Sequence, residues 1–275
     1  MNGARCAHTA SVLANGKVLV TCGWIGSTSM SSTELYDPLI GTWTTTGSMN
    51  TIRHWHATSL LTNGKVLMTG GLSGSFYPNS TELYDPLIGT WTTTGSIINT
   101  RYLHTANVLT NEKVLVTRGY SNGSSLYSAE LYDPLTETWT ATGSMNIARH
   151  WHIASLLTNG KVLVTGGSNT STSLNSAELY DPLLGTWTTT GSMNTERAYH
   201  TVSLLTNGKV LVAGGRISFS SQASAELYKP VTETWTITGS MNTAQFGHTA
   251  SSLTDGRVLV AGGWNLHAWN TTELY

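Results

Sequence analysis

The segment TELYDPLIGTWTTTGS occupies residues 33–48 and occurs again, unchanged, at residues 81–96. Self-similarity at a fixed period of this size is typical of propellers, solenoids and other repeat proteins. Six histidines keep a spacing of 48 residues along the chain: His8, His56, His104, His152, His200 and His248. We therefore expect a single domain spanning residues 1–275, built from six repeats. Their approximate bounds are 1–48, 49–96, 97–144, 145–192, 193–240 and 241–275.

Each repeat predicts four short strands, and the second repeat shows the pattern. The expected strands are HATSLL (56–61), KVLMTGG (65–71), TELYDP (81–86) and TWTTTG (90–95). An Asn-Gly pair between the first two predicts a two-residue hairpin turn, in which both turn residues have positive φ. A variable loop rich in Ser, Thr and Gly separates the second strand from the third.

Four strands in a unit of about 50 residues are the signature of a β-propeller blade. Gly70 and Gly71 end the second strand, Tyr84 lies in the third and Trp91 opens the fourth. This arrangement resembles the kelch motif, and it recurs along essentially all 275 residues. The resemblance implies an all-β, six-bladed kelch-type β-propeller. Single residues depart from the motif without breaking it: Cys22 and Arg118 at the first Gly, Glu112 at the turn Gly, and Lys229 at the Asp.

The sixth repeat is shorter than the others. Tyr275 aligns with Tyr228, so the strand that would carry the next Trp is missing. We expect a last blade of three strands, with the outer strand absent. The alternative is that the sequence is a fragment of a longer protein. The compartment stays open: cytoplasmic if Met1 is the true start, and extracellular if the chain is part of a longer secreted protein.

Two cysteines are present, Cys6 and Cys22. If Ala14 pairs with Lys17 across the turn, Cys22 lies opposite Thr9. Cys6 would then point to the other face of the sheet, because side chains alternate along a strand. We therefore expect no Cys6–Cys22 disulfide.

Composition excludes several partners. The formal net charge is −1 and 11% of the residues are charged, which argues against nucleic acid as a partner. No polybasic segment suits a membrane surface, and no apolar run approaches the 18 residues of a spanning helix.

The loop before each first strand and the loop after each Gly-Gly are expected at the same end of the blade. These loops vary strongly between repeats, whereas the Asn-Gly-Lys and Asp-Pro-Leu turns at the other end barely change. Varied loops on a rigid scaffold are typical of a recognition surface, and the resemblance agrees, because kelch domains usually bind partners on that face. The expected ligand-binding residues are His54, Trp55, Tyr102, His150, Trp151, Tyr199, Phe246, Trp24, Tyr120, Arg216 and Trp264.

Charges outside the repeat pattern are few. Arg118 and Arg216 border the variable loops and are the best placed to meet an acidic group. The Arg and Glu residues that recur with the repeat are expected to pair within or between blades.

Residues that recur in nearly every repeat are expected to be structural. They are the six histidines above and Trp43, Trp91, Trp139, Trp187 and Trp235. A metal on the histidines is less favoured, because metal sites usually need three or four converging ligands rather than six symmetric ones. No catalytic set, phosphate loop or cofactor motif stands out.

The sequence favours a non-catalytic scaffold that binds a protein or peptide. A lectin-like propeller that stacks sugars on rim Trp and Tyr residues is the alternative. An enzyme similar to the copper-radical kelch oxidases is less favoured, since those need Tyr and His ligands, a Cys–Tyr cross-link and a further domain. Recently duplicated sequence with little selected function is the plainest alternative.

Overall fold

The computed structural model describes residues 1–169 and 171–275. Every element assigned in these residues is a β-strand, and the strands form six main antiparallel sheets, one for each repeat. Five of these described sheets have four strands, and the last has three, in the order β27-β28-β31. The prediction of an all-β, six-bladed propeller with a three-stranded last blade is confirmed. The part of the chain that is described contains no helix suited to crossing a membrane.

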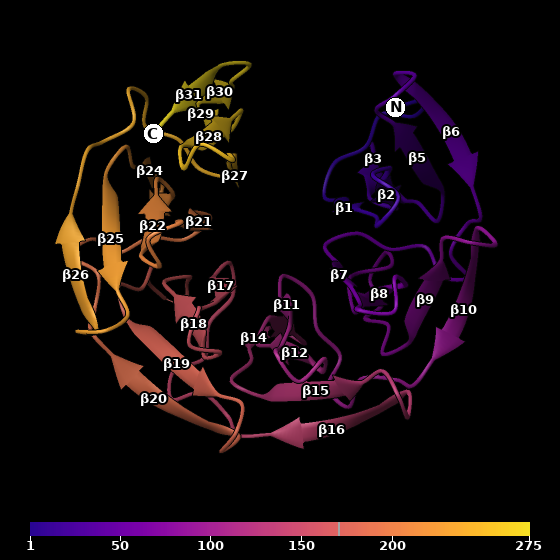
Figure 1. The fold of residues 1–275 in the computed structure, drawn as a ribbon, viewed down its shortest axis with the longest axis horizontal. Helices are drawn as coiled ribbons and strands as arrows, with labels where there is room; N and C mark the ends of the chain where they lie inside the picture. The colour runs from indigo at the N-terminus through magenta and orange to yellow at the C-terminus, as the bar shows by residue number, and fades with distance from the viewer. Residues whose placement is uncertain (170) are drawn as a thin grey trace. The chain divides into compact units, whose positions relative to one another are not determined.

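The blades fall into two compact units of three blades each. The first unit comprises residues 1–124 and 128–142, and the second comprises residues 125–127 and 143–275. Within each blade the strands lie side by side in chain order, so that β7 and β10, for example, form opposite edges of one sheet (Figure 1).

The strands of the first unit follow the repeat. Blade 1 contains β1 (Thr9–Val12), β2 (Val18–Thr21), β5 (Thr33–Asp37) and β6 (Thr42–Thr46), with the loop hairpin β3 (Trp24–Ile25) and β4 (Thr28–Ser29). Blade 2 contains β7 (Ala57–Leu60), β8 (Val66–Thr69), β9 (Thr81–Asp85) and β10 (Thr90–Thr94). Blade 3 contains β11 (Thr105–Val108), β12 (Val114–Thr117), β15 (Ala129–Asp133) and β16 (Thr138–Thr142), with β13 (Tyr120–Ser121) and β14 (Ser124–Ser125).

The second unit repeats the pattern. Blade 4 contains β17 (Ile153–Leu156), β18 (Val162–Thr165), β19 (Ala177–Asp181) and β20 (Thr186–Thr190). Blade 5 contains β21 (Thr201–Leu204), β22 (Val210–Ala213), β25 (Ala225–Lys229) and β26 (Thr234–Ile237), with β23 (Arg216–Ile217) and β24 (Ser220–Ser221). Blade 6 contains β27 (Thr249–Ser252), β28 (Val258–Ala261) and β31 (Thr272–Leu274), with β29 (Trp264–Asn265) and β30 (His267–Ala268).

The hydrophobic core lies between neighbouring blades. The second strand of a blade is a short apolar run, which suits a strand covered on both faces of its sheet. In blade 2, for example, all four residues of β8 are buried. Leu13 and Leu19 of blade 1 pack in one cluster with Val66 and Met68 of blade 2. The outer strands are different, since β10 buries Trp91 and exposes threonines. Blades therefore stabilise one another face to face.

In the blades described next, the recurring Tyr and Trp bond the end of the outer strand that precedes their blade. In blade 3 the indole Nε1 of Trp139 donates to the carbonyl of Gly95 at 3.0 Å, and the Tyr132 hydroxyl bonds Thr94 Oγ1 at 2.8 Å. Only glycine fits at position 95, because a Cβ would collide with the Glu137 carbonyl. The equivalent bonds in the second unit are Trp187 to Gly143, Trp235 to Gly191 and Tyr228 to Thr190.

The recurring Arg and Glu form a buried pair inside each of the first five blades. The pairs are Arg5–Glu34, Arg53–Glu82, Arg101–Glu130, Arg149–Glu178 and Arg197–Glu226. All five pairs lie within a blade and none of them joins two blades, which settles the alternative that the sequence left open. In blade 6 Gln245 takes the place of Arg, and Glu273 accepts bonds from Asn242.

The predicted register of the first hairpin is wrong by one residue. Leu13, rather than Ala14, pairs with Lys17, and Thr9 lies opposite Thr21. The loop has three residues: a turn closed by the bond from Gly16 N to Leu13 O, followed by Gly16 at φ +80°. This is the three-residue hairpin with a bulge, which needs positive φ only at the glycine.

The cysteines are free, with Cys6 exposed and Cys22 buried. The reason differs from the predicted one, because the corrected register no longer sets the two on opposite faces. Cys6 forms a bridge opposite Trp24, whereas the Cys22 thiol points into the core and contacts the Met49 sulfur at 2.9 Å. Burial raises the pKa of Cys22 to about 12, so this thiol stays protonated.

Glu112 occupies the turn position that is glycine in the other five repeats, and its φ is +68°. A residue with a Cβ is strained in this region, at a cost of about 1 kcal/mol or more. We expect Glu112→Gly to raise the free energy of unfolding by about 1 kcal/mol, measured by urea denaturation. Gly160→Glu at the same turn position is the reciprocal control and should lower it. Equal free energies of unfolding for Glu112→Gly and the wild type would show that the positive φ of Glu112 does not destabilise the fold.

Candidate functional site

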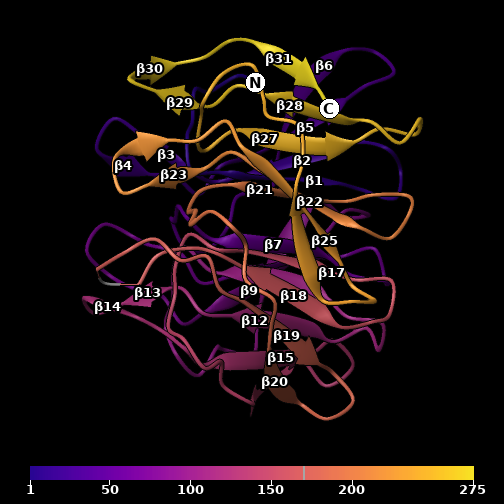
Figure 2. The ribbon, with the colours of Figure 1, turned by 90° about the vertical axis from the view of Figure 1, so that its left-hand side faces the viewer.

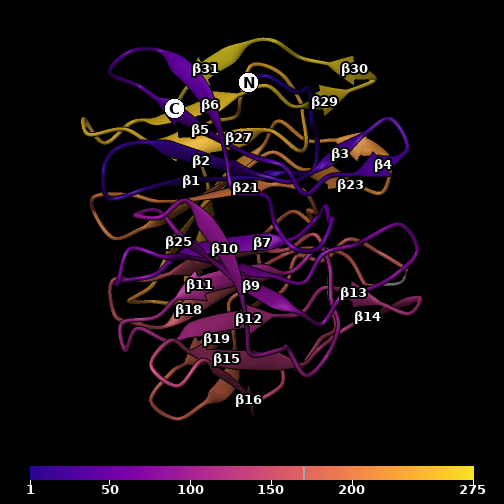
Figure 3. The same ribbon diagram turned by 90° about the vertical axis from the view of Figure 1, so that its right-hand side faces the viewer.

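The two variable loops of every blade meet at one end of the sheet, as predicted. An antiparallel bridge joins the residue two places before each His to the residue after Gly-Gly. The bridged pairs are Cys6–Trp24, His54–Leu72, Tyr102–Tyr120, His150–Ser168, Ala198–Arg216 and Phe246–Trp264. The small loop hairpins extend from this same side, with β23 and β29–β30 in the second unit (Figure 2) and β3–β4 and β13 in the first (Figure 3). We call this end of each blade the variable-loop face.

The residue just before each recurring His has a left-handed backbone. Ala7, Trp55, Leu103, Trp151 and Tyr199 have φ between 51° and 55°. Each such non-glycine residue costs about 1–3 kcal/mol and persists only where its surroundings enforce it. Backbone bonds to the neighbouring blade do so here: Trp55 N donates to Ala7 O at 3.1 Å and Tyr199 N to Trp151 O at 3.2 Å. The large side chains of Trp55, Trp151 and Tyr199 are thereby fixed at the variable-loop face.

The first unit presents a row of aromatic rings. Trp24 stacks on His54 at 5.7 Å between ring centroids, and Trp55 stacks on Tyr102 at 5.8 Å. His54 and Trp55 lie 4.7 Å apart, and Tyr120 meets Tyr102 edge-on at 5.7 Å. Trp55 is 39% exposed, whereas Trp24, Tyr102 and Tyr120 are half-buried. The row joins predicted ligand-binding residues from three successive blades.

His54 and His150 lie beneath the variable-loop face rather than on it. Their side chains are 5% and 6% exposed. His54 Nδ1 bonds Ser29 Oγ at 2.9 Å, and His150 Nδ1 bonds Ser125 Oγ at 2.8 Å. Burial lowers the pKa of His54 and lowers that of His150 to about 4, so both rings are neutral near pH 7. Their geometry supports the rings above them and leaves little surface for a ligand.

The second unit holds a compact cluster of four predicted residues. Trp151, Tyr199 and Phe246 come from blades 4, 5 and 6, and Trp151 stacks on Tyr199 at 4.4 Å. The guanidinium carbon of Arg216 lies 5.3, 4.5 and 5.0 Å from the ring centroids of Trp151, Tyr199 and Phe246. All three distances fall within the range of cation–π attraction.

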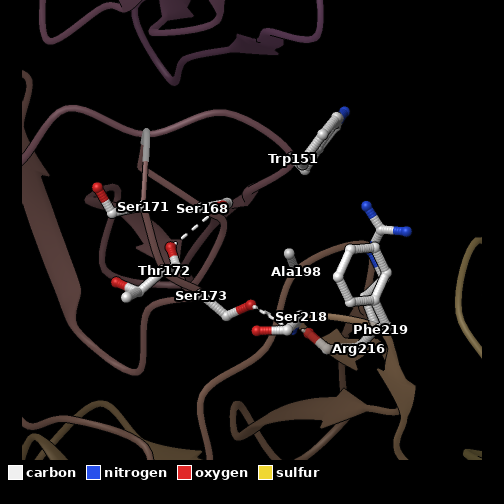
Figure 4. A pocket seen from close by; sticks show the side chains of 9 residues that line it. All are labelled: Trp151, Ser168, Ser171, Thr172, Ser173, Ala198, Arg216, Ser218 and Phe219. Atoms are coloured by element: carbon white, nitrogen blue, oxygen red, sulfur yellow. Dashed lines mark hydrogen bonds between the residues drawn. The ribbon is translucent and has the colours of Figure 1, made fainter.

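A pocket of about 220 Å³ adjoins this cluster. Its lining residues are Trp151, Ser168, Ser171, Thr172, Ser173, Ala198, Arg216, Ser218 and Phe219. Figure 4 shows Trp151, Arg216 and Phe219 on one side of the pocket, with Ser168, Ser171 and Thr172 on the other. The pocket combines one cation, aromatic surface and hydroxyl groups.

The structure separates the two arginines that the sequence treats alike. Arg118 is fully buried, and its backbone carbonyl accepts a bond from Arg101 Nη1 at 3.0 Å. Arg118 occupies the position of the first Gly of Gly-Gly, which faces the interior of the blade, so its predicted availability to an acidic partner is wrong. Arg216 follows the Gly-Gly pair and remains half-buried at the variable-loop face. Trp264 at the equivalent position of blade 6 is 49% exposed.

The recurring histidines tie neighbouring blades together. His56 Nε2 bonds Thr21 Oγ1 at 2.9 Å across the first blade junction, and His200 Nε2 bonds Thr165 Oγ1 at 2.9 Å in the second unit. His248 bonds Thr201 instead, because Ala213 replaces the threonine. Across residues 1–169 and 171–275, no group of three or more His, Cys, Asp or Glu side chains is arranged to hold a metal ion.

The sequence comparison identifies the family. The model of the kelch motif matches residues 5–50, 101–146, 152–194 and 197–242, which together make up more than half of the chain. The chain belongs to the kelch family. Kelch propellers are commonly protein-binding scaffolds and are typically non-catalytic. Comparison with curated proteins gave no match.

Phe219 is one of the aromatic residues that the sequence places in the variable loops, and it is fully exposed at the tip of the β23–β24 hairpin, beside the pocket. The sequence missed one feature of this kelch protein. The opposite end of the blades exposes apolar side chains in its turns, which vary little between repeats. They are Leu39, Leu87, Leu135, Leu183 and Val231. Their regular recurrence had suggested a purely structural role.

Proposed function

We propose that the chain is a non-catalytic kelch scaffold that binds a protein or peptide through the variable-loop face. The observation that carries this proposal is the cluster of Trp151, Tyr199, Phe246 and Arg216 beside the pocket of the second unit. Aromatic residues and arginine are the residue types that dominate binding energy in protein interfaces. The backbone strain beneath Trp151 and Tyr199 supports the same reading, because strained residues concentrate at functional sites.

The rigidity of the cluster also favours binding. Trp151 and Tyr199 are held by their stacking and by the hydrogen bond between their backbones. A side chain that is already ordered loses less conformational entropy when a partner docks. The face therefore offers preorganised anchors rather than a surface that must rearrange.

Trp151→Ala is expected to weaken the binding of a peptide ligand by about 30-fold or more, because truncating a buried interface Trp costs 2 kcal/mol or more. The ligands would come from display of short random peptides selected against the full chain, with affinities measured by fluorescence polarisation. Leu183→Ser is the matched control, since it lies in the same blade at the turn end and is 93% exposed. Loss of binding in Leu183→Ser, together with full binding in Trp151→Ala, would place the binding site at the turn end of the blades and contradict the proposal.

A lectin-like role is the second candidate. It is favoured by the exposed indoles of Trp55 and Trp264 and by the hydroxyl-lined pocket, since sugars stack on aromatic faces and bond hydroxyl groups. A glycan array probed with the wild type and with the double variant Trp55→Ala/Trp151→Ala tests it. Glycan binding that the double variant loses would favour the lectin, whereas an empty array would favour the peptide.

A further inference from the structure

We infer that the partner presents a carboxylate beside an apolar side chain, and that Arg216 binds this carboxylate in the 220 Å³ pocket. This inference rests on the proposed function, because it names the chemistry of the peptide that the variable-loop face would bind.

The position of Arg216 is fixed from both ends. Its backbone is bridged to Ala198, with N–O distances of 3.0 and 2.8 Å in the two directions. The Ser173 hydroxyl also donates to the Arg216 carbonyl, at 3.4 Å. At the other end, the guanidinium lies against the rings of Tyr199 and Phe246. The charged group is thus held in place, and no described acidic side chain pairs with it.

No hydrogen bond between described residues uses the donors of this guanidinium. The recurring arginines each spend theirs on a buried glutamate and on carbonyl groups, as Arg197 does with Glu226 and Gly214. Among the described residues, the Arg216 side chain forms only its aromatic contacts, with no hydrogen bond or ion pair. A guanidinium presents its donors as a planar fork that matches the two oxygens of a carboxylate.

The lining of the pocket favours a ligand group with a single negative charge. Of the described residues that line it, Arg216 alone is charged, and the polar remainder consists of Ser and Thr. Phosphate groups carry about 1.5–2 negative charges and are usually met by clusters of arginines. Ser171 and Ser218 are exposed at the edge of the pocket and can donate further hydrogen bonds to a carboxylate.

Phe219 and Trp151 are the reason for proposing an apolar side chain next to the carboxylate of the ligand. Phe219 is fully exposed on the wall that also carries Arg216, and the indole of Trp151 lines the same pocket. A large exposed apolar side chain beside a fixed cation gives a partner an apolar contact next to the charged group, and covering its surface contributes to binding. An Asp or Glu with an adjacent Leu, Ile or Phe would fill both positions.

The test is a double-mutant cycle on peptides from the display selection. We expect the selected peptides to share an Asp or Glu next to an apolar residue. Arg216→Gln and the acid-to-amide change in the peptide should each weaken binding by roughly 10–100-fold, the range for a hydrogen-bonded charged pair. Combined, the two changes should cost little more than either alone. Arg216→Lys, which keeps the charge but lacks the fork, should recover only part of the affinity.

The outcomes separate this inference from the proposed function. Neutral or basic peptides that bind Arg216→Gln as well as the wild type, but lose binding to Trp151→Ala, would overturn the carboxylate site and leave the binding face intact. Phosphopeptides that outcompete carboxylate peptides would also overturn it. Selection of no peptide at all would overturn both. The near-ultraviolet circular dichroism spectrum of Arg216→Gln should match that of the wild type, which would show that the aromatic cluster remains packed.

Discussion

Replacing Arg53 with Gln is expected to lower the free energy of unfolding by about 3–5 kcal/mol, the cost of breaking a buried ion pair by removing one partner. The Arg53 and Glu82 side chains are both fully buried, with Nη2 and Oε1 3.1 Å apart. Arg53 also donates to the carbonyls of Gly70 and Ser80. Its loss therefore leaves a buried carboxylate and two backbone acceptors short of a partner.

The sixth repeat naturally lacks this ion pair, and it shows what accompanies the loss of the arginine. Gln245 stands where the other repeats have Arg, and the side chain of Glu273 is only half-buried. The double variant Arg53→Gln/Glu82→Gln should recover a large part of the loss, because no buried charge is left unpaired. Guanidinium denaturation of both variants measures the difference. A single variant no less stable than the double one would show that the pair does not hold the blade together.

Acidification from pH 7 to pH 5 is the second large effect, with an expected loss of about 4 kcal/mol from two histidines alone. Burial, reinforced by Arg53, lowers the pKa of His56 to about 3, and burial lowers that of His248 to about 4. In the unfolded chain both titrate near 6.5. The native state therefore keeps them neutral while the unfolded state takes up protons. Their stabilisation is complete above pH 6.5 and is lost as the pH falls toward about 4 for His248 and about 3 for His56.

Substituting one histidine measures how much that residue contributes to the loss of stability between pH 7 and pH 5. Each of the two contributes about 2 kcal/mol between pH 7 and pH 5. Burial also lowers the pKa of His104 and His200 well below 6.5, which steepens the dependence. His56→Gln should be less stable than the wild type at pH 7 and should lose about 2 kcal/mol less on acidification. Parallel pH profiles of the two proteins, from thermal unfolding at each pH, would show that His56 titrates alike in the folded and unfolded states and would contradict this prediction.

The strand positions could be predicted because local signals agree. The second repeat predicts a strand at 81–86, and β9 covers Thr81–Asp85. The hairpin register could not be predicted in the same way. An Asn-Gly pair suits a two-residue loop and also the three-residue loop that forms here, in which Asn15 Oδ1 accepts a bond from Lys17 N. Only the pairing of the strands distinguishes the two.

The site was predicted in part. The bridges between variable loops confirm that the residues before His and after Gly-Gly come together, as the repeat geometry requires. The burial of His54 was not predictable, because its partner Ser29 belongs to a loop of the preceding blade with no repeat signal. The sequence treats Arg118 and Arg216 alike, but Arg118 takes the place of the first glycine of the pair, with φ +60°, whereas Arg216 follows the second glycine. This difference of two repeat positions decides whether the side chain is buried or presented.

The most direct test of the binding face is hydrogen exchange of the full chain with and without its tightest selected peptide. We expect slowed exchange at the backbone amides near Trp151, Tyr199 and Arg216, with no change at the Asn-Gly-Lys and Asp-Pro-Leu turns. Protection confined to those turns, around the exposed Leu87 and Leu183, would contradict the account and move the binding surface to the opposite end of the blades.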